Sequence, residues 1–346
     1  MTMDREADAG AELRYLVTGG AGFIGSHLVD ALVARGERVL ILDDLSTGSR
    51  ENVQHLPGDR VELIVGSVLD RDLVDDCMRQ VDACFHLAAA VGVRLLVEQT
   101  LESVRSNALG ADNVITLAAQ HNKRMLFTSS SEVYGQGDGM PAREGAHRPL
   151  AYRMHARRAY AASKLFAEAL AESCARELDS ETVVARLFNT VGPRQIGRYG
   201  MVLPRFVDQA LAGSDLTVYG NGRQSRCFLH VFDAVAALIG LMDSDAATAG
   251  VYNVGSSDVT RIVDLSDLVI DRVGSTTSRT RFVPFEVAYE PGFEDVERRT
   301  PDTTALREVI DWEPQHTLLE AIDELITARR GRWDPSVEMP VPREVS

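Results

Sequence analysis

The feature that most constrains the fold is a short apolar run at 14–18 that ends in a glycine-rich turn and continues into a segment of helical periodicity at 26–35. Gly19, Gly22 and Gly25 stand three residues apart in this turn. That spacing allows a tight turn, close approach of the backbone to a pyrophosphate, and close packing of a helix on a strand. The N-terminus of the helix would also face negative charge. The sequence therefore predicts a strand, a glycine turn and a helix that bind a dinucleotide.

Asp43 indicates which dinucleotide is bound. It ends the next apolar run, at 38–42, and lies eighteen residues beyond Gly25. A carboxylate at about this separation meets the 2′-hydroxyl of the adenosine ribose. Because the same carboxylate would repel a 2′-phosphate, we predict NAD rather than NADP as the cofactor.

Further apolar runs alternate with segments long enough for helices. The runs lie at 61–65, 83–87, 124–128 and 182–187, with helical segments such as 71–80 and 101–120 between them. This alternation predicts an α/β fold, a Rossmann-type doubly wound parallel sheet. Ligands bind at the carboxyl ends of the strands of such sheets, so residues 87–89 and 129–132 should border the same crevice as the glycine turn.

Tyr160 and Lys164 are the candidate proton-transfer residues. They lie four apart in an alanine-rich run, 157–178, that is predicted to be a helix, so their side chains share one face. An ammonium beside a phenol favours the phenolate and lowers the pKa of the tyrosine, and a phenolate can accept a proton from an alcohol. Ser130 follows the strand at 124–128 and could hydrogen-bond to the same alcohol.

Four motifs together resemble one family. They are Thr-Gly-Gly-Ala-Gly-Phe-Ile-Gly at 18–25, Leu-Ala-Ala at 87–89, Ser-Ser-Glu-Val-Tyr-Gly at 130–135 and Tyr-Ala-Ala-Ser-Lys at 160–164. From about residue 13 to residue 330 the chain resembles an extended short-chain dehydrogenase/reductase of the nucleotide-sugar epimerase, dehydratase and decarboxylase group.

The resemblance implies roles for individual residues. Tyr160 would be the base, Lys164 its electrostatic partner and the anchor of the nicotinamide ribose, and Ser130 the hydroxyl partner. The NAD-binding set would comprise Gly19, Gly22, Phe23, Ile24, Gly25, Asp43, Leu87, Ala88, Ala89, Asn107, Tyr160 and Lys164. The set that binds the UDP-sugar would comprise Asn189, Leu203, Tyr219 against the uracil, and Arg226 and Arg299 on the diphosphate. One position departs from the family pattern, because Ser67 stands where an acidic residue near the adenine is usual.

Changes in composition along the chain predict its domains. Residues 1–12 are expected to be a flexible tail, 13–190 the NAD-binding domain, 191–333 a substrate lobe partly interleaved with it, and 334–346 a second tail. The net charge of −15 argues against nucleic acid or an anionic membrane as the main partner. Four scattered cysteines with no metal-ligand spacing predict no metal site and a reducing, cytoplasmic location. The resemblance further suggests a homodimer.

The sequence predicts the first half of the reaction, an oxidation, and leaves the second half open. Tyr160 with NAD implies oxidation of the sugar at C4 to a 4-keto intermediate. Return of the hydride to the other face gives 4-epimerisation of a UDP-hexose or UDP-hexuronate, which is the leading expectation because 194–200 lacks the His-Pro-Asn-Asp-Gly sequence usual in UDP-glucuronate decarboxylases. Glu132 stands in a Ser-Glu pair typical of decarboxylases and some dehydratases. It keeps two alternatives open, UDP-glucuronate decarboxylation first and 4,6-dehydration of a nucleotide sugar second. A non-catalytic NAD-binding regulator is the remaining alternative.

Overall fold

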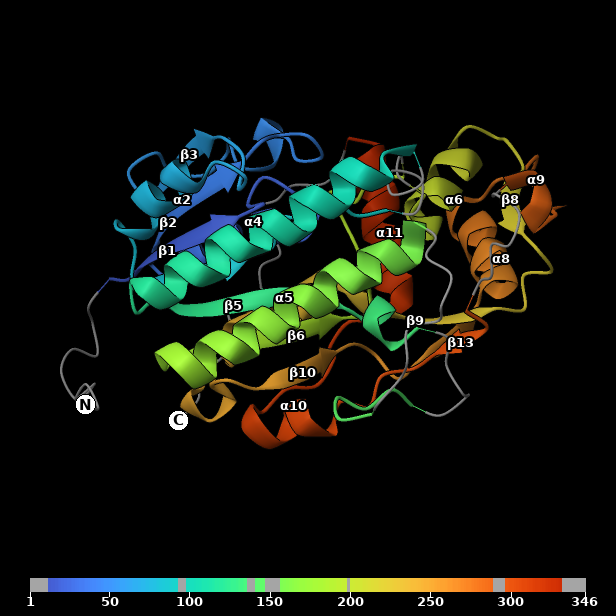
Figure 1. Ribbon diagram of the computed structural model, residues 1–346. Coiled ribbons are helices and arrows are strands. Elements are labelled where there is room, and N and C mark those ends of the chain that lie inside the picture. The colour runs from blue at the N-terminus through green and yellow to red at the C-terminus, as the bar shows by residue number, and fades with distance from the viewer. Residues whose placement is uncertain are drawn as a thin grey trace.

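A seven-stranded parallel sheet forms the centre of the molecule (Figure 1). The computed structural model describes residues 12–92, 98–135, 141–146, 156–197, 200–288 and 296–331. The strand order is β10-β6-β5-β4-β1-β2-β3, and every neighbouring pair is parallel. The strands are β1 (Arg14–Thr18), β2 (Arg38–Asp43), β3 (Val61–Val65), β4 (Ala83–His86), β5 (Arg124–Ser130), β6 (Thr182–Leu187) and β10 (Val251–Val254). The predicted fold class, a Rossmann-type doubly wound sheet, is confirmed.

Helices cover both faces of this sheet, because its strands are apolar on both sides. Successive residues of β1 face opposite cores: Tyr15 and Val17 pack with α1 (Phe23–Ala34) and α7 (Val231–Asp243), whereas Leu16 packs with the other helices. Those helices are α2 (Arg71–Met78), α4 (Thr100–Gln120) and α5 (Ala156–Leu178), and Figure 1 shows α4 and α5 lying side by side across one face. Parallel sheets buried on both faces have this uninterrupted apolar pattern.

A smaller lobe follows the sixth strand. It holds β7 (Asn189–Val191), β9 (Ser225–His230), β11 (Val259–Arg261) and β13 (Arg298–Arg299) in one sheet, and β8 (Leu216–Tyr219) with β12 (Thr280–Val283) in another. The helices α6 (Val202–Leu211), α8 (Ile262–Val273) and α11 (Leu318–Arg329) enclose its core. Short helices complete the described chain: η1 (Arg50–Asn52), η2 (Ser131–Tyr134), η3 (Asp245–Ala247), α9 (Phe285–Ala288) and α10 (Thr304–Val309).

The two lobes are interleaved, since β10 returns to the large sheet from within the stretch 191–333. Several element ends differ from the sequence prediction by one to three residues, including two strand ends. Strand β5 continues to Ser130, and the strand at 83–87 ends at His86. The predicted tails lie outside the described residues except for Glu12, whose carboxylate pairs with Arg60 at 2.9 Å. None of the helices in the described ranges is long and apolar enough to span a membrane.

Candidate active site

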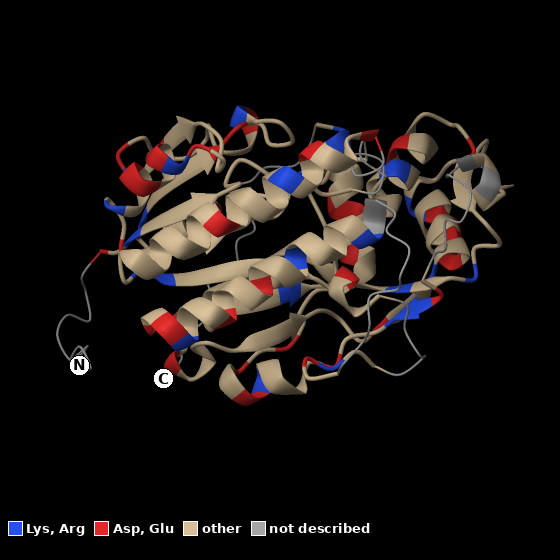
Figure 2. Cartoon of the chain, in the orientation of Figure 1, with Lys and Arg blue, Asp and Glu red and all other residues tan. Residues whose placement is uncertain are grey.

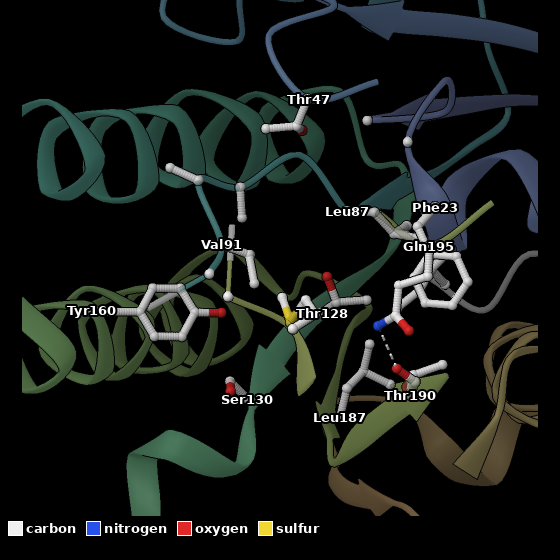
Figure 3. Close-up of a pocket in the computed structure, with 18 of the residues that line it drawn as sticks. Phe23, Thr47, Leu87, Val91, Thr128, Ser130, Tyr160, Leu187, Thr190 and Gln195 are labelled. Carbon is white, nitrogen blue, oxygen red and sulfur yellow. Dashed lines mark hydrogen bonds between the residues drawn. The ribbon is translucent and has the colours of Figure 1, made fainter. Parts of the chain in front are cut away.

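A cavity of about 990 Å³ opens at the carboxyl ends of the parallel strands. The glycine turn and the ends of β2, β4 and β5 form one wall, and α6, β8 and β9 form the other. Figure 3 shows the phenol of Tyr160 directed into this cavity, with Ser130 and Thr128 close to it and Phe23 and Gln195 farther across. The strand ends therefore meet at one crevice, as the alternating pattern predicts.

The glycine turn has no room for side chains. Gly19 adopts a φ of +72°, and a Cβ on Gly25 would lie 2.1 Å from the carbonyl oxygen of Gly19. The amide of Gly22 donates to that same oxygen at 3.1 Å, and Gly22 caps α1 without a side-chain hydrogen bond. The turn thus brings a helix N-terminus and bare backbone to the cavity, which fits the pyrophosphate of a dinucleotide.

Asp43 lies at the end of β2 and lines the cavity. Its carboxylate accepts the backbone N–H groups of Ala21 at 2.9 Å and Leu45 at 2.8 Å. Burial raises its pKa, and these two hydrogen bonds oppose that rise. The position fits the predicted ribose contact, but Asp43 also braces the glycine turn through Ala21, which the spacing did not indicate.

The segment after β4 lies in the same wall. Leu87, Ala88 and Ala89 line the cavity. Asn107 is not a lining residue; it accepts the N–H of Ala90 at 2.8 Å and donates to the carbonyl of Ala90 at 3.1 Å. Its predicted role near the cofactor is therefore to hold the backbone that follows Ala89.

Tyr160, Lys164 and Ser130 converge beside this wall, and all three line the cavity. The side chain of Tyr160 is 6% exposed, and its phenol hydrogen-bonds with the Ser130 hydroxyl. The Nζ of Lys164 donates to the carbonyl oxygen of Thr128 at 2.8 Å and lies 5.9 Å from the centre of the Tyr160 ring. The helix α5 and the end of β5 thus bring together the three residues that the sequence motifs predict.

The electrostatics of this group correct one expectation. We expected Lys164 to lower the pKa of Tyr160, but burial dominates and raises it, and the charge of Glu132 raises it further. The hydrogen bond from Ser130 opposes the rise, whereas burial lowers the pKa of Lys164 to about 7. Ser130 is therefore the neighbour whose hydrogen bond favours the phenolate in this structure, while removal from water penalises the charged forms of both Tyr160 and Lys164.

Glu132 and Arg299 form an ion pair at the edge of the cavity. An Nη1 to Oε1 distance of 2.7 Å joins them, and Arg299 also donates to the carbonyl of Gly135 at 3.2 Å. Glu132 lines the cavity, whereas Arg299 is 7% exposed and does not. A guanidinium buried this deeply needs a carboxylate partner, and Glu132 supplies it; the expected contact between Arg299 and a diphosphate stays a prediction.

The remaining substrate-binding candidates all line the cavity: Asn189, Leu203, Tyr219 and Arg226. Arg226 donates to the carbonyl oxygen of Val296 at 2.7 Å. Arg205, which no sequence motif indicated, also lines the cavity, and its guanidinium lies 4.6 Å above the ring of Tyr219. Arg205 is a cation within the largely apolar helix α6, and this pattern in the sequence could have indicated a role for it.

The described residues hold no group of three or more side chains suited to a metal ion. All four cysteines are buried free thiols.

Residues 15–255 match the sequence profile of the NAD dependent epimerase/dehydratase family. The chain belongs to this family. The resemblance inferred from the motifs is thereby confirmed, and so is NAD as the cofactor. This member of the NAD dependent epimerase/dehydratase family is an NAD-dependent enzyme of nucleotide-sugar chemistry.

Relatives of this family member include two uronate decarboxylases. It is 38% identical over 314 residues to a UDP-N-acetyl-alpha-D-glucosaminuronate decarboxylase of Bacillus cytotoxicus. The matched region covers 90% of this chain and 96% of that relative. It is 34% identical over 325 residues to UDP-glucuronic acid decarboxylase 1 of Arabidopsis thaliana, covering 92% and 70%.

A solved structure similar to this family member is a UDP-N-acetylglucosamine 4-epimerase from Methanobrevibacter ruminantium, with a TM-score of 0.83, 29% identity, and coverage of 93% and 99%. The sequence relatives thus favour decarboxylation, which the motifs had placed second, while solved relatives include 4-epimerases.

Proposed function

We propose that this enzyme is a UDP-hexuronate decarboxylase that oxidises the sugar at C4 before carbon dioxide leaves. The ion pair between Glu132 and Arg299, beside the phenol of Tyr160, carries the proposal. Relatives at 38% and 34% identity that are named as uronate decarboxylases support it. Decarboxylation therefore replaces 4-epimerisation as the leading hypothesis.

The first step uses Tyr160 and Ser130. Ser130 holds the C4 oxygen by hydrogen bonding, and Tyr160 takes the hydroxyl proton as the carbon–hydrogen bond breaks. When bound, NAD would supply reversible hydride transfer at C4. Lys164, fixed on the carbonyl of Thr128, places a cation behind the phenol when it is protonated.

The second step follows from the position of the ketone. A ketone at C4 is β to the C6 carboxylate, so the electron pair of the C5–C6 bond can pass to the C4 oxygen as carbon dioxide leaves. The resulting enolate must regain a proton at C5. We assign this later stage to Glu132, which lines the cavity next to Ser130 and is held by Arg299. Its carboxylate takes a proton from solvent water and passes it to C5, so the net reaction consumes one solvent proton. An epimerase that only moves hydride out and back requires no such acid or base.

Product analysis tests the proposal. Purified enzyme with NAD is incubated separately with UDP-glucuronate, UDP-N-acetylglucosaminuronate and UDP-glucose, and the products are read by mass spectrometry and NMR. We expect a product lighter by one carbon dioxide from a uronate and no net change in UDP-glucose. A uronate product of unchanged mass with inverted C4 would instead establish epimerisation, the second candidate, which the similarity to solved 4-epimerases favours.

We also infer that two copies of the chain associate through the outer face of α4 and α5. Leu101 and Leu109 of α4 and Phe166 of α5 are 65%, 54% and 48% exposed. Figure 2 shows tan stretches between the charged residues of these two helices. Apolar side chains gathered on neighbouring helices are typical of an interface. Sedimentation equilibrium should give the mass of a dimer.

The buried free thiols further support the expected reducing, cytoplasmic location.

A further inference from the structure

A second buried ion pair lies behind the residues that carry the chemistry. Glu168 of α5 and Arg186 of β6 are joined by two hydrogen bonds, Nη2 to Oε2 at 2.6 Å and Nε to Oε1 at 3.0 Å. Their side chains are 9% and 11% exposed. Burying two charges is costly even when the geometry is good, so such a pair is weak evidence for stability and invites a different explanation.

The pair contacts the segments that carry the candidate catalytic residues. Ser129, which precedes Ser130 at the end of β5, donates to Oε1 of Glu168 at 2.5 Å. Arg186 donates to the hydroxyl of Tyr134 at 2.9 Å and lies 4.9 Å above the ring of Tyr134. Tyr134 belongs to the short helix η2, which also holds Glu132. Glu168 itself is on α5 with Tyr160 and Lys164. One ion pair thus connects β5, η2 and α5.

Glu168 also acts on Lys164 through its charge. Tyr160, Lys164 and Glu168 are four residues apart on α5 and share one face. The other groups against Lys164 are the Phe127 ring, the carbonyl of Thr128 and His86. Burial lowers the pKa of His86 to about 3, so it stays neutral and does not repel the ammonium of Lys164.

Burial lowers the pKa of Lys164 to about 7, and the carboxylate of Glu168 opposes that fall. Without this carboxylate, Lys164 would lose its proton at a lower pH. The charge on Arg186 would also be left uncompensated nearby, which would make the ammonium still less favourable.

We propose that the Glu168–Arg186 pair is a positioning device for proton abstraction: Glu168 keeps Lys164 charged and, through Ser129, holds Ser130 in register with Tyr160. The inference rests on the proposed function for its kinetic consequences, but its electrostatic half does not depend on any substrate. Glu168 acts through Lys164 and Ser130 and does not line the cavity.

The charge on Lys164 can be measured directly, because the sequence contains two lysines, Lys123 and Lys164. Enzyme labelled with ¹³C and ¹⁵N in lysine is titrated by NMR without substrate, as the unmodified protein and as Glu168→Gln. The control is Glu181→Gln, which removes the partner of Arg124 at the opposite end of β5. We expect Glu168→Gln to lower the pKa of Lys164 by about one unit and leave Lys123 unchanged, with no shift in the control. Identical Lys164 titrations in all three proteins would overturn the electrostatic role.

Steady-state kinetics test the second half. We expect Glu168→Gln to lower kcat on the UDP-hexuronate by about 10- to 100-fold near neutral pH while KM changes less than about threefold. The decline of kcat with rising pH should also begin at a lower pH, which a purely structural defect would not cause. Glu181→Gln should match the unmodified enzyme in kcat and in pH profile.

Ser129→Ala provides an independent variant should Glu168→Gln fail to fold. It removes the hydroxyl that joins Glu168 to the strand and leaves both charges in place. We expect kcat to fall about threefold to tenfold with the Lys164 titration unchanged. An unchanged kcat in Ser129→Ala would overturn the registration of Ser130. If no nucleotide sugar is turned over at all, the proposed function fails, while the NMR titration still decides the role of Glu168.

Discussion

The two walls of the cavity are built by different means. The cofactor wall consists of backbone at the ends of neighbouring parallel strands, where Gly19 and Gly25 leave no space for a side chain. The substrate wall consists of side chains brought from separate segments, such as Arg205 against Tyr219, with Glu132 and Arg299 paired at its edge. Backbone geometry therefore shapes the first wall, and pairing between side chains shapes the second.

The largest effect should come from Tyr160, which serves the chemistry at the junction of the two walls. Tyr160→Phe keeps the ring and its packing but removes the oxygen that hydrogen-bonds with Ser130. We expect kcat to fall by about 10²-fold or more, with the affinities for NAD and the UDP-sugar nearly unchanged. Rapid-mixing kinetics and calorimetric binding measure the two quantities separately. A variant with near-normal turnover would show that another group removes the proton.

Glu132→Gln should have the next largest effect, because it separates the two reactions that the family relatives perform. The amide keeps the shape of the side chain but removes the charge that pairs with Arg299 at 2.7 Å. We expect turnover to fall about 10- to 100-fold, with NADH and a 4-keto sugar accumulating in a single turnover.

The absorbance of enzyme-bound NADH measures this accumulation of NADH directly. Unhindered return of hydride in Glu132→Gln would contradict the decarboxylase proposal and restore 4-epimerisation. Glu181→Gln, at the far end of β5, serves as the matched control for loss of a paired carboxylate.

Gly25→Ala tests the cofactor wall alone. The new Cβ would lie 2.1 Å from the carbonyl oxygen of Gly19, so the turn must shift away from the position that fits a pyrophosphate. We expect the affinity for NAD to fall about tenfold, while UDP binding in the absence of NAD is unaffected. Gly58→Ala is the control, since nothing lies within 4 Å of the atom it adds. Equal NAD affinity in both variants would mean that the turn does not hold the cofactor.

The contrast between the walls also explains what could be predicted from the sequence. The glycine turn, Asp43 and the Tyr160–Lys164 pair depend on local spacing and on the rule that parallel strands end at one edge, so the sequence placed them correctly around the cavity. The pairing of Arg299 with Glu132 joins residues 167 positions apart in the chain, and no periodicity carries that information.

Burial was the second missing quantity. Spacing shows that Tyr160 and Lys164 share a helix face, but the direction of each pKa depends on how much water surrounds it. Both side chains are almost fully buried, so desolvation outweighs the attraction that the sequence suggested. The buried network of Glu168, Arg186 and Ser129 likewise became visible only when α5, β5 and β6 were packed together.

The smallest effect should come from Arg205, which sharpens the description of the substrate wall. Its guanidinium lies above the Tyr219 ring, and its Nη2 donates to the carbonyl of Thr217 at 3.0 Å, so it braces the ring that is expected to contact the nucleobase. Arg205→Met keeps the length and packing of the side chain but removes the cation. An interaction of this kind contributes about 0.5–1 kcal/mol at partly exposed sites, so we expect the Kd for UDP to rise about two- to fivefold, with kcat unchanged. Arg272→Met, which removes an exposed arginine paired with Asp323 away from the cavity, should leave the Kd unchanged in the same calorimetric titration. If the two variants bind UDP equally well, Tyr219 needs no such brace, and the base must be held by other parts of the wall.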